Sequence, residues 1–564
     1  MKYLFLILLF ISTNCFAANI YVDKTLGANC TTGNYSITNR ACDGSDGNAY
    51  QTVAGAIAAM SGGDDIYLRG GTYYEHDIYI AESKSGTSEN WSSMQSYPGE
   101  WAIIDGQRQC TNTNIPSIIC NGYFASYDST TYAKYWKFER LEITGGGDSS
   151  SEVNVMASGI HWNKGPITIR YCYVHDNLAN NPNENPGGIT GCSTHDAIVE
   201  YNYLKNNGAV DLDAEENSRN ICFFGSSYSE TTDTDWYVHN NEIRYNLIET
   251  GGASGISMKA NQDLTTTRDG SDTSRNTWGD KIHHNIVLDS NIYGIQWSQD
   301  YCQIYNNIVQ HGDLAGEESA GILVTSFRLG CYNTLDSVVY NNTVIDTHSA
   351  AIFNEYVYDA GEGDIEPAIW WVYNNIIDNH THDWDREDIT FGSNSAAAIV
   401  LTDIYVDRNL FYRCDANEDS ITMGPSDWTI AEFISASGKS EEMWKHAYNA
   451  GDLLYQATSG ADQYKIETAY TLGTGNVTNK GKGGTHPYLS GVTIPSYIGA
   501  VNPNGVDSGL DWDPDSPNPD DAGWVDYVLN LANALGNHNR ATISSTGNAK
   551  ATFSPTGNVT MEIQ

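Results

Sequence analysis

The sequence predicts an all-β protein: a right-handed parallel β-helix, a solenoid with an N-terminal capping helix and an irregular C-terminal cap. Three observations predict it. A short motif ending in Asn recurs through the chain, a second motif starting Gly-Ile recurs beside it, and the 564 residues include 37 Tyr, 14 Trp and 53 Gly. Aromatic residues favour strands, glycine favours turns, and stacked short repeats are typical of solenoids.

The Asn motif is Ile/Val-x-x-Asn with an apolar residue two positions after the Asn. Its asparagines lie 22 residues apart at the closest and otherwise 33 to 44 apart, which fits a minimal coil with loop insertions. We expect each Asn at the turn after a short strand, bonding the backbone of the next coil in a ladder of amides. The copies are Val199–Asn202, Ile243–Asn246, Ile282–Asn285, Ile304–Asn307, Val339–Asn342, Val372–Asn375 and Val406–Asn409, with an imperfect copy at Ile169–Cys172.

The second motif predicts another strand in each coil. If its Ile points inward, alternation turns Ser257 and Lys259 outward. Outward residues of neighbouring coils would share that face, which is the natural groove of a solenoid, whereas the two Trp residues of these strands would point into the core. The motifs start at Gly159, Gly188, Gly255, Gly294 and Gly321; the expected outward residues are His161, Asn163, Ser257, Lys259, Gln296, Ser298 and Thr325; the inward Trp residues are Trp162 and Trp297.

The chain divides into a signal, a solenoid and a cap. Residues 1–17 predict a secretory signal peptide, with Lys2 before an apolar run and a small-x-small cleavage site ending at Ala17. Residues 18–414 predict the β-helix with its N-terminal cap, and residues 415–564 predict late coils and a C-terminal capping region. We expect a secreted protein, extracellular or periplasmic, and a monomer.

Short helices are expected at both caps. Residues 50–60 predict an amphipathic helix that covers the open end of the first coil, where a sheet edge would otherwise be exposed. Residues 65–73 predict the strand that follows it. Residues 427–448 and 525–535 predict helices near the C-terminus.

Charge and cysteine content limit the partners. Asp and Glu number 70 against 29 Lys and Arg, a net charge of -41, so nucleic-acid binding and docking on anionic membranes are not expected. The acidity fits either a salt-tolerant secreted protein or carboxylates gathered for a divalent cation. In an exported protein close cysteines oxidise, and Cys30 with Cys42 and Cys110 with Cys120 are the candidate pairs. No CxxC pair supports a zinc ribbon.

Lys259 is the candidate catalytic base. Between residues 210 and 438 it and Lys281 are the only lysines, and Ser257 and Asn261 flank it. A neutral lysine can take the C5 proton of a uronate sugar if burial or a nearby cation lowers its pKa. The competing interpretation is an ordinary solvated surface lysine.

An acidic cluster lies one repeat before the Lys259 strand. Close carboxylates repel one another unless a cation lies among them, and oxygen-rich sites suit Ca²⁺. An acidic surface loop explains the cluster equally well. The candidate calcium ligands are Asp196, Asp211, Asp213, Glu215 and Glu216.

The two ends of the chain carry a resemblance. Ile20–Asp23, Tyr50–Val53, Asp65–Tyr73 and Ser496–Val501 resemble segments of secreted β-helix polysaccharide-degrading enzymes. With Lys259 in Gly255-Ile-Ser-Met-Lys after acidic residues, the chain most resembles family 9 pectate lyases and, more loosely, family 6 alginate and chondroitin lyases. This resemblance implies Lys259 as the base and the cluster as calcium ligands.

The expected function is therefore cleavage of an acidic, uronate-containing polysaccharide such as pectate or alginate by Ca²⁺-assisted β-elimination. The cation would stabilise charge that develops beside the sugar carboxylate. Candidate substrate contacts are Ser257, Asn261, Gln296, Ser298, Arg268 and Arg275. Two alternatives stay open: a glycoside hydrolase of the same fold with paired carboxylates, and a non-catalytic glycan-binding protein or adhesin.

Overall fold

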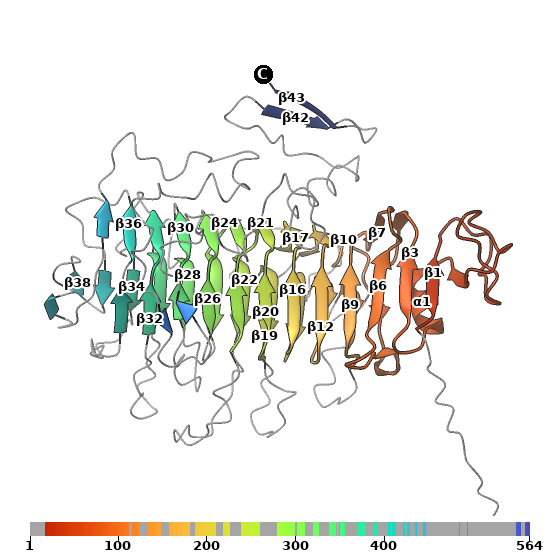
Figure 1. Cartoon of the computed structure of the whole chain (residues 1–564), viewed down its shortest axis with the longest axis horizontal. Helices are drawn as coiled ribbons and strands as arrows, with labels where there is room; N and C mark the ends of the chain where they lie inside the picture. The colour runs from red at the N-terminus through yellow and green to blue at the C-terminus, as the bar shows by residue number, and fades with distance from the viewer. Residues whose placement is uncertain are drawn as a thin grey trace, which may run out of the picture.

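The chain forms a right-handed parallel β-helix in which three long sheets run side by side along one axis (Figure 1). Each coil gives one strand to each sheet in turn, so neighbouring strands of a sheet are parallel and come from successive coils. The computed structural model describes residues 17–111, 116–122, 132–147, 157–180, 186–209, 218–225, 238–259, 279–298, 302–310, 320–325, 338–345, 347, 350–355, 370–378, 389–392, 404–407, 409–412, 421–423, 426–428, 432, 435–436, 444–446, 484–485, 493–494, 549–553 and 559–563.

Sheet A has 13 strands. In spatial order they are β2 (Asn48–Tyr50), β1 (Asn19–Val22), β3 (Asp65–Leu68), β6 (Ser92–Ser96), β9 (Trp136–Glu139), β12 (Ile167–Arg170), β16 (Ala197–Glu200), β20 (Glu242–Arg244), β23 (Lys281–His283), β26 (Gln303–Tyr305), β29 (Val338–Tyr340), β32 (Trp370–Tyr373) and β35 (Ile404–Asp407).

Sheet B has 12 strands. They are β4 (Gly71–Tyr73), β7 (Ala102–Asp105), β10 (Leu141–Thr144), β13 (Tyr173–His175), β17 (Tyr203–Lys205), β21 (Leu247–Gly251), β24 (Ile286–Ser290), β27 (Ile308–Gln310), β30 (Thr343–Ile345), β33 (Ile376–Asp378), β36 (Leu410–Tyr412) and β39 (Trp444–His446).

Sheet C also has 12 strands and carries the Gly-Ile motifs. They are β5 (Ile78–Tyr79), β8 (Ser117–Cys120), β11 (Ser158–His161), β15 (Gly187–Cys192), β19 (Arg219–Phe224), β22 (Ser254–Lys259), β25 (Tyr293–Ser298), β28 (Ala320–Thr325), β31 (Ala350–Glu355), β34 (Ile389–Gly392), β37 (Ile421–Met423) and the antiparallel β38 (Ser426–Trp428). Short pairs stand apart: β14 (Leu178–Ala179) with β18 (Gly208–Ala209), β40 (Gly484–Thr485) with β41 (Thr493–Ile494), and β42 (Ala549–Phe553) with β43 (Val559–Ile563).

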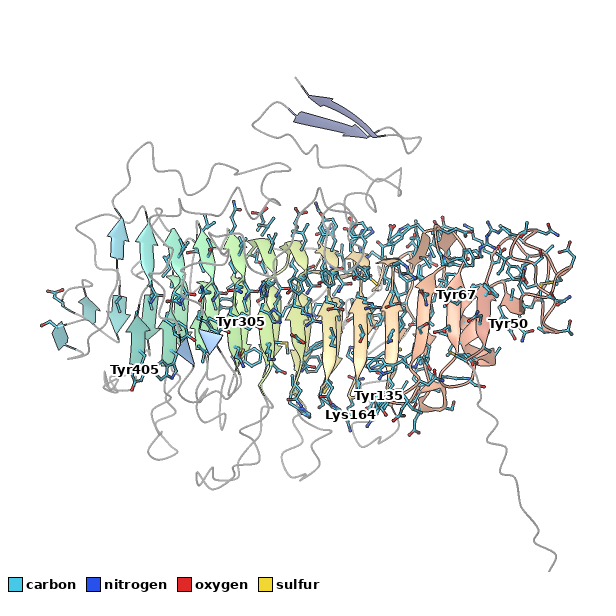
Figure 2. All side chains as sticks on the ribbon, viewed as in Figure 1. Tyr50, Tyr67, Tyr135, Lys164, Tyr305 and Tyr405 are labelled. Carbon is cyan, nitrogen blue, oxygen red and sulfur yellow. A yellow bond between two sulfur atoms is a disulfide. The ribbon has the colours of Figure 1, made fainter. Side chains whose placement is uncertain are left out.

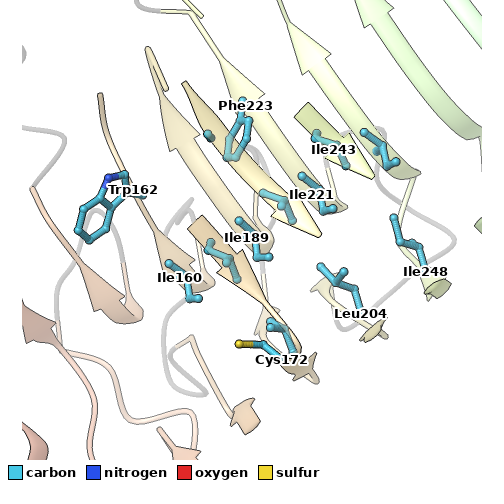
Figure 3. Packing of buried hydrophobic residues seen from close by; sticks show 14 of the residues in the cluster. Ile160, Trp162, Cys172, Ile189, Leu204, Ile221, Phe223, Ile243 and Ile248 are labelled. Carbon is cyan, nitrogen blue, oxygen red and sulfur yellow. The ribbon is translucent and has the colours of Figure 1, made fainter. Parts of the chain in front are cut away.

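One continuous core fills the solenoid, because alternate residues of every strand point inward. Ile160, Ile189 and Ile221 of sheet C follow one another on adjacent strands and are fully buried (Figure 3). Trp162 and Trp297 belong to the same cluster and are also fully buried, which confirms their predicted inward direction.

Glycine precedes the inward isoleucine of β11, β15, β22, β25 and β28, and at each of these positions a side chain would collide with neighbouring atoms. A methyl group on Gly321 would lie 2.5 Å from Val344 Cγ1 and 2.9 Å from the Ala351 carbonyl oxygen, closer than real contacts. The Gly-Ile motif therefore marks a position that has no room for a side chain.

The predicted ladder of asparagine amides is confirmed, but the side chains bond the backbone of the preceding coil and not that of the next. Asn202, Asn246, Asn285, Asn307, Asn342, Asn375 and Asn409 are joined by amide hydrogen bonds of 2.9 to 3.1 Å from each Nδ2 to the Oδ1 of the next. Each Nδ2 also donates to a strand carbonyl of the preceding coil, such as Asn307 to Ile282 at 2.9 Å. The imperfect copy joins through its backbone, since Cys172 N–H donates to Asn202 Oδ1.

The N-terminal cap forms as predicted around α1 (Val53–Ala59). Thr52 Oγ1 accepts from Gly55 N–H, and the carboxylate of Glu75 accepts from the free N–H groups of Val53 and Ala54. At the other end Lys84 Nζ, in the 3-10 helix η1 (Glu82–Lys84), donates to the Met60 carbonyl. Both ends of a very short helix are thus satisfied.

Two predictions of local structure differ from the fold. Cys30 and Cys42 form a disulfide, but Cys110 and Cys120 are not bonded to each other. Pairing in sheet C fixes Cys120 between Tyr79 and His161, whereas the Cys110 N–H is held by the Gly147 carbonyl. The helix predicted for residues 427–448 is also wrong at its ends, where β38 and β39 extend the sheets.

The predicted signal peptide and the helix predicted at 525–535 lie outside the described residues, and the boundaries at 414 and 415 stay predictions. Within the described residues, no helix is long and apolar enough to cross a membrane.

Candidate active site

Lys259 is the last residue of β22 and lies on the outer face of sheet C. Ile256 and Met258 of this strand are fully buried in the core, so alternation turns Ser257 and Lys259 to the other side. Lys259 pairs with Phe224 of β19 and Ser298 of β25. Ser257 is fully buried, whereas Lys259 is partly exposed. The amine therefore stands at the accessible end of a buried polar surface.

A hydrogen-bonded network lies beneath Lys259. Oε1 of Gln296 accepts from Ser257 Oγ at 2.8 Å and from Arg219 Nη2 at 3.4 Å. Gln296 and Arg219 are 3% and 2% exposed. Since two donors hold this oxygen, the orientation of the amide is fixed. The burial of Ser257 and Gln296 favours a supporting role beside Lys259 over open contact with a substrate.

Cys222 lies within the same network, aligned with Ser257 across adjacent strands. Burial raises the pKa of its thiol, while the positive charges of Lys259 and Arg219 act in the opposite direction. Since burial is the larger effect, the thiol stays neutral.

The preceding coils extend this surface with neutral polar groups. His161 is fully buried, and burial lowers its pKa to about 4. Its Nδ1 lies 2.8 Å from Thr190 Oγ1 and its Nε2 lies 2.9 Å from Asn163 Oδ1. Since that Oδ1 also accepts from Cys192 N–H, we assign the proton of the neutral imidazole to Nε2. These hydrogen bonds hold His161 and Asn163 in place as part of the buried polar surface.

Asp196, the one candidate calcium ligand within the described residues, lies in the turn from β15 to β16. Its carboxylate accepts from His195 Nδ1 at 2.8 Å and from Asn240 Nδ2 at 3.3 Å. Burial opposes its ionisation, but the hydrogen bond and charge of His195 outweigh that effect and lower its pKa. The side chain is 44% exposed, so an ionised, accessible carboxylate lies at the edge where sheet C strands end.

For the remaining predicted site residues the structure describes no side chain. Within the described residues no group of three His, Cys, Asp or Glu side chains could hold a metal ion. The backbone of Ser298 pairs with Lys259, but nothing is described of its side chain. Outside the described residues lie Asp211, Asp213, Glu215, Glu216, Asn261, Arg268 and Arg275.

Arg219 and Cys222 belong to this network and were not predicted. Their strand has Asn220 where the other copies have glycine, so the Gly-Ile motif does not mark it. Aligning Ile221 with Ile256 would have placed Cys222 beside Ser257 and Arg219 beside Ser254.

Comparisons with known proteins give a partial match. No protein-family model matches the sequence. Pectate lyase PEL9 of Emericella nidulans is 34% identical over 114 residues, which cover 18% of this chain and 27% of that protein. The chain thus spans about a quarter of the length of this curated relative.

Solved structures of low sequence identity are also similar to the chain. Pectate lyase Pel9A is 13% identical with a TM-score of 0.41, covering 86% of this chain and 96% of its own. The lacto-N-biosidase of Eubacterium ramulus is 13% identical with a TM-score of 0.43, covering 76% and 68%. An alginate lyase from Paenibacillus sp. is 15% identical with a TM-score of 0.38, covering 60% and 94%. The chain is a parallel β-helix protein that is similar, over a limited part of its sequence, to a pectate lyase.

Proposed function

We propose that this protein is a secreted polysaccharide lyase that cleaves an acidic, uronate-containing polysaccharide by β-elimination, with Lys259 as the base. The local identity to a pectate lyase supports the reaction class. The outward, partly exposed position of Lys259 at the end of β22 supports its assignment as the base.

The observation that carries the proposal is the exposure of Lys259 at the end of a buried, hydrogen-bonded network. Among the described strands of sheet C it is the only lysine. Buried surroundings and a nearby cation both favour the neutral form of an amine in general, and only the neutral form can accept a proton. Arg219, whose Nη2 donates to Gln296, is a buried cation of the network that lies beside Lys259.

In the proposed reaction, Lys259 takes the proton at C5 of the uronate, the C4–O bond breaks as a C4=C5 double bond forms, and the leaving glycosidic oxygen takes a proton from water. Ser257 and Gln296 hold the surface beneath the amine, and Asn261, Ser298, Arg268 and Arg275 are the proposed substrate contacts. A bound Ca²⁺ would neutralise the uronate carboxylate as charge develops beside it. Its proposed ligands are Asp196, Asp211, Asp213, Glu215 and Glu216; the ionised carboxylate of Asp196 is a donor of the type a hard cation prefers.

The test is a screen on pectate, alginate and a glycosaminoglycan that follows the ultraviolet absorbance of the unsaturated product. Lys259→Ala should lower the rate by about 10²- to 10⁴-fold, the usual contribution of a general base. Lys259→Arg, which keeps the charge but cannot act as a base, should do the same. Lys281→Ala removes an exposed lysine of sheet A and should leave the rate unchanged.

Chelation should abolish the activity, and added Ca²⁺ should restore it. Equal rates for Lys259→Ala and the parent would show that the base is another group. New reducing ends without absorbance would identify a hydrolase instead.

A further inference from the structure

The first coils differ in charge from the rest of the chain. Residues 17–170 hold 10 Lys and Arg against 16 Asp and Glu, whereas residues 171–564 hold 18 against 54. Residues 17–170 therefore carry less net negative charge per residue than the rest of the chain, and they repel a polyanion less.

Aromatic and basic side chains gather on the outer face of sheet A in this region. Lys137, on β9, has its Nζ 5.5 Å from the centre of the Trp91 ring. Trp91, just before β6, meets Tyr135 edge-on with ring centres 5.6 Å apart. All three side chains are partly exposed. They lie where two neighbouring coils begin their sheet A strands.

The next row of the same face continues the pattern. Tyr67 of β3 aligns with Gln95 of β6, and the amide oxygen of Gln95 accepts from Arg140 Nη2. Tyr67, Gln95 and Arg140 are also partly exposed. Tyr67 and Tyr135 are both labelled on the first coils in Figure 2. We call Tyr67, Trp91, Gln95, Tyr135, Lys137 and Arg140 the sheet A patch.

The two cations of the patch share their rows with two carboxylates, those of Asp65 and Glu139. Within the described residues neither Lys137 nor Arg140 forms an ion pair, whereas Arg40, Arg69, Arg170 and Arg244 each do. Glu139 is paired with Arg170, whereas Asp65 accepts from the neutral Ser93 hydroxyl and keeps its charge. The patch thus presents accessible positive charge between aromatic rings.

We propose that the sheet A patch binds an acidic polysaccharide without cleaving it, as an anchoring site apart from Lys259 on sheet C. Sugar rings pack on flat aromatic side chains, and uronate carboxylates pair with Lys and Arg. Neighbouring coils are about 4.8 Å apart, similar to the repeat of a pyranose chain, so a chain along the axis sets successive sugars over β3, β6 and β9. The substrate class rests on the proposed function; the site rests on the geometry of the patch.

The test measures binding in a Lys259→Ala background, so that the polymer is not consumed. Affinity gel electrophoresis with polygalacturonate, alginate and neutral dextran gives a dissociation constant for each. Lys137→Gln should weaken binding to the acidic polymers about threefold, as an exposed ion pair predicts. Trp91→Ala should weaken it about tenfold, while Trp91→Phe keeps most of it. Lys281→Gln, which removes the same charge from the same face four coils away, should have no effect.

Higher salt should weaken binding to acidic polymers, and dextran should not bind. Melting temperatures equal to that of the background protein show that each variant is folded. If Lys137→Gln and Trp91→Ala retain the affinity of the background protein, the patch is not a binding site. If the wild-type protein cleaves no polymer but these variants still lose affinity, the proposed function fails and the anchoring site stands.

Discussion

The asparagine ladder makes a quantitative prediction at Asn307, which is fully buried in its centre. Its side chain donates to the carbonyls of Ile282 and Tyr305 and to Asn342 Oδ1, at 2.9 to 3.1 Å. It accepts from the backbone N–H and the Nδ2 of Asn285, at 3.1 and 3.0 Å. Asn307→Ala removes all five bonds and leaves buried partners unsatisfied.

At roughly 1 kcal/mol net for each buried hydrogen bond, the variant should lose about 4 to 5 kcal/mol. Urea unfolding should show a lower midpoint with an unchanged m-value. Hydrogen exchange should accelerate first in β26 and β27, because each coil of a solenoid contacts only its neighbours.

Two further variants sharpen this test. Asn307→Asp keeps the acceptor but loses the donors, so its stability should recover only at low pH, where the carboxyl is protonated. Asn39→Ala removes an exposed side chain bonded to Asp43 and should cost less than about 0.5 kcal/mol. A loss in Asn307→Ala no greater than that of Asn39→Ala would refute the reasoning.

Three other predictions concern buried groups. Burial raises the pKa of Asp280 to about 8 against 3.8 as its ordinary value, so the stability that its proton contributes is complete below about pH 4 and is lost as pH rises through 8. Asp280→Asn should remove this decline in melts from pH 5 to pH 9. Burial lowers the pKa of His161 to about 4 against 6.5, so the stability present above pH 6.5 should fall as pH drops toward 4, and melts of His161→Gln should lack that slope. Gly321→Ala places a methyl group 2.5 Å from Val344 Cγ1 and should lower the free energy of unfolding in urea by about 1 to 3 kcal/mol. The control Ala351→Gly, in the next coil, should lower it by about 1 kcal/mol at most. Equal small losses in the two variants would show that the core has room for the methyl group.

The repeats were readable from the sequence because each has a local cause. Asn202 and its equivalents satisfy backbone groups that every coil exposes at the same turn, and the glycines of the Gly-Ile motif lie where a side chain would strike the core. Alternation along a strand then placed Trp297 inside and Lys259 outside without reference to the rest of the chain.

The cysteine pairs show the limit of sequence spacing. Cys30 and Cys42 lie 12 residues apart and are bonded, whereas Cys110 and Cys120 lie closer in sequence and are not. Sequence separation does not determine the direction of a side chain, and pairing within sheet C fixes that direction for Cys120.

Sequence patterns were enough to identify the solenoid, its ladder and the outward direction of Lys259, because each depends on contacts that repeat from one coil to the next. Which side chains share a surface follows from the three-dimensional fold alone. Arg219 contacts Gln296 across 77 residues of sequence, and Tyr67, Trp91 and Lys137 gather from three coils. The loops between coils vary in length, so the register between distant strands follows from the pairing of whole sheets and not from any local pattern.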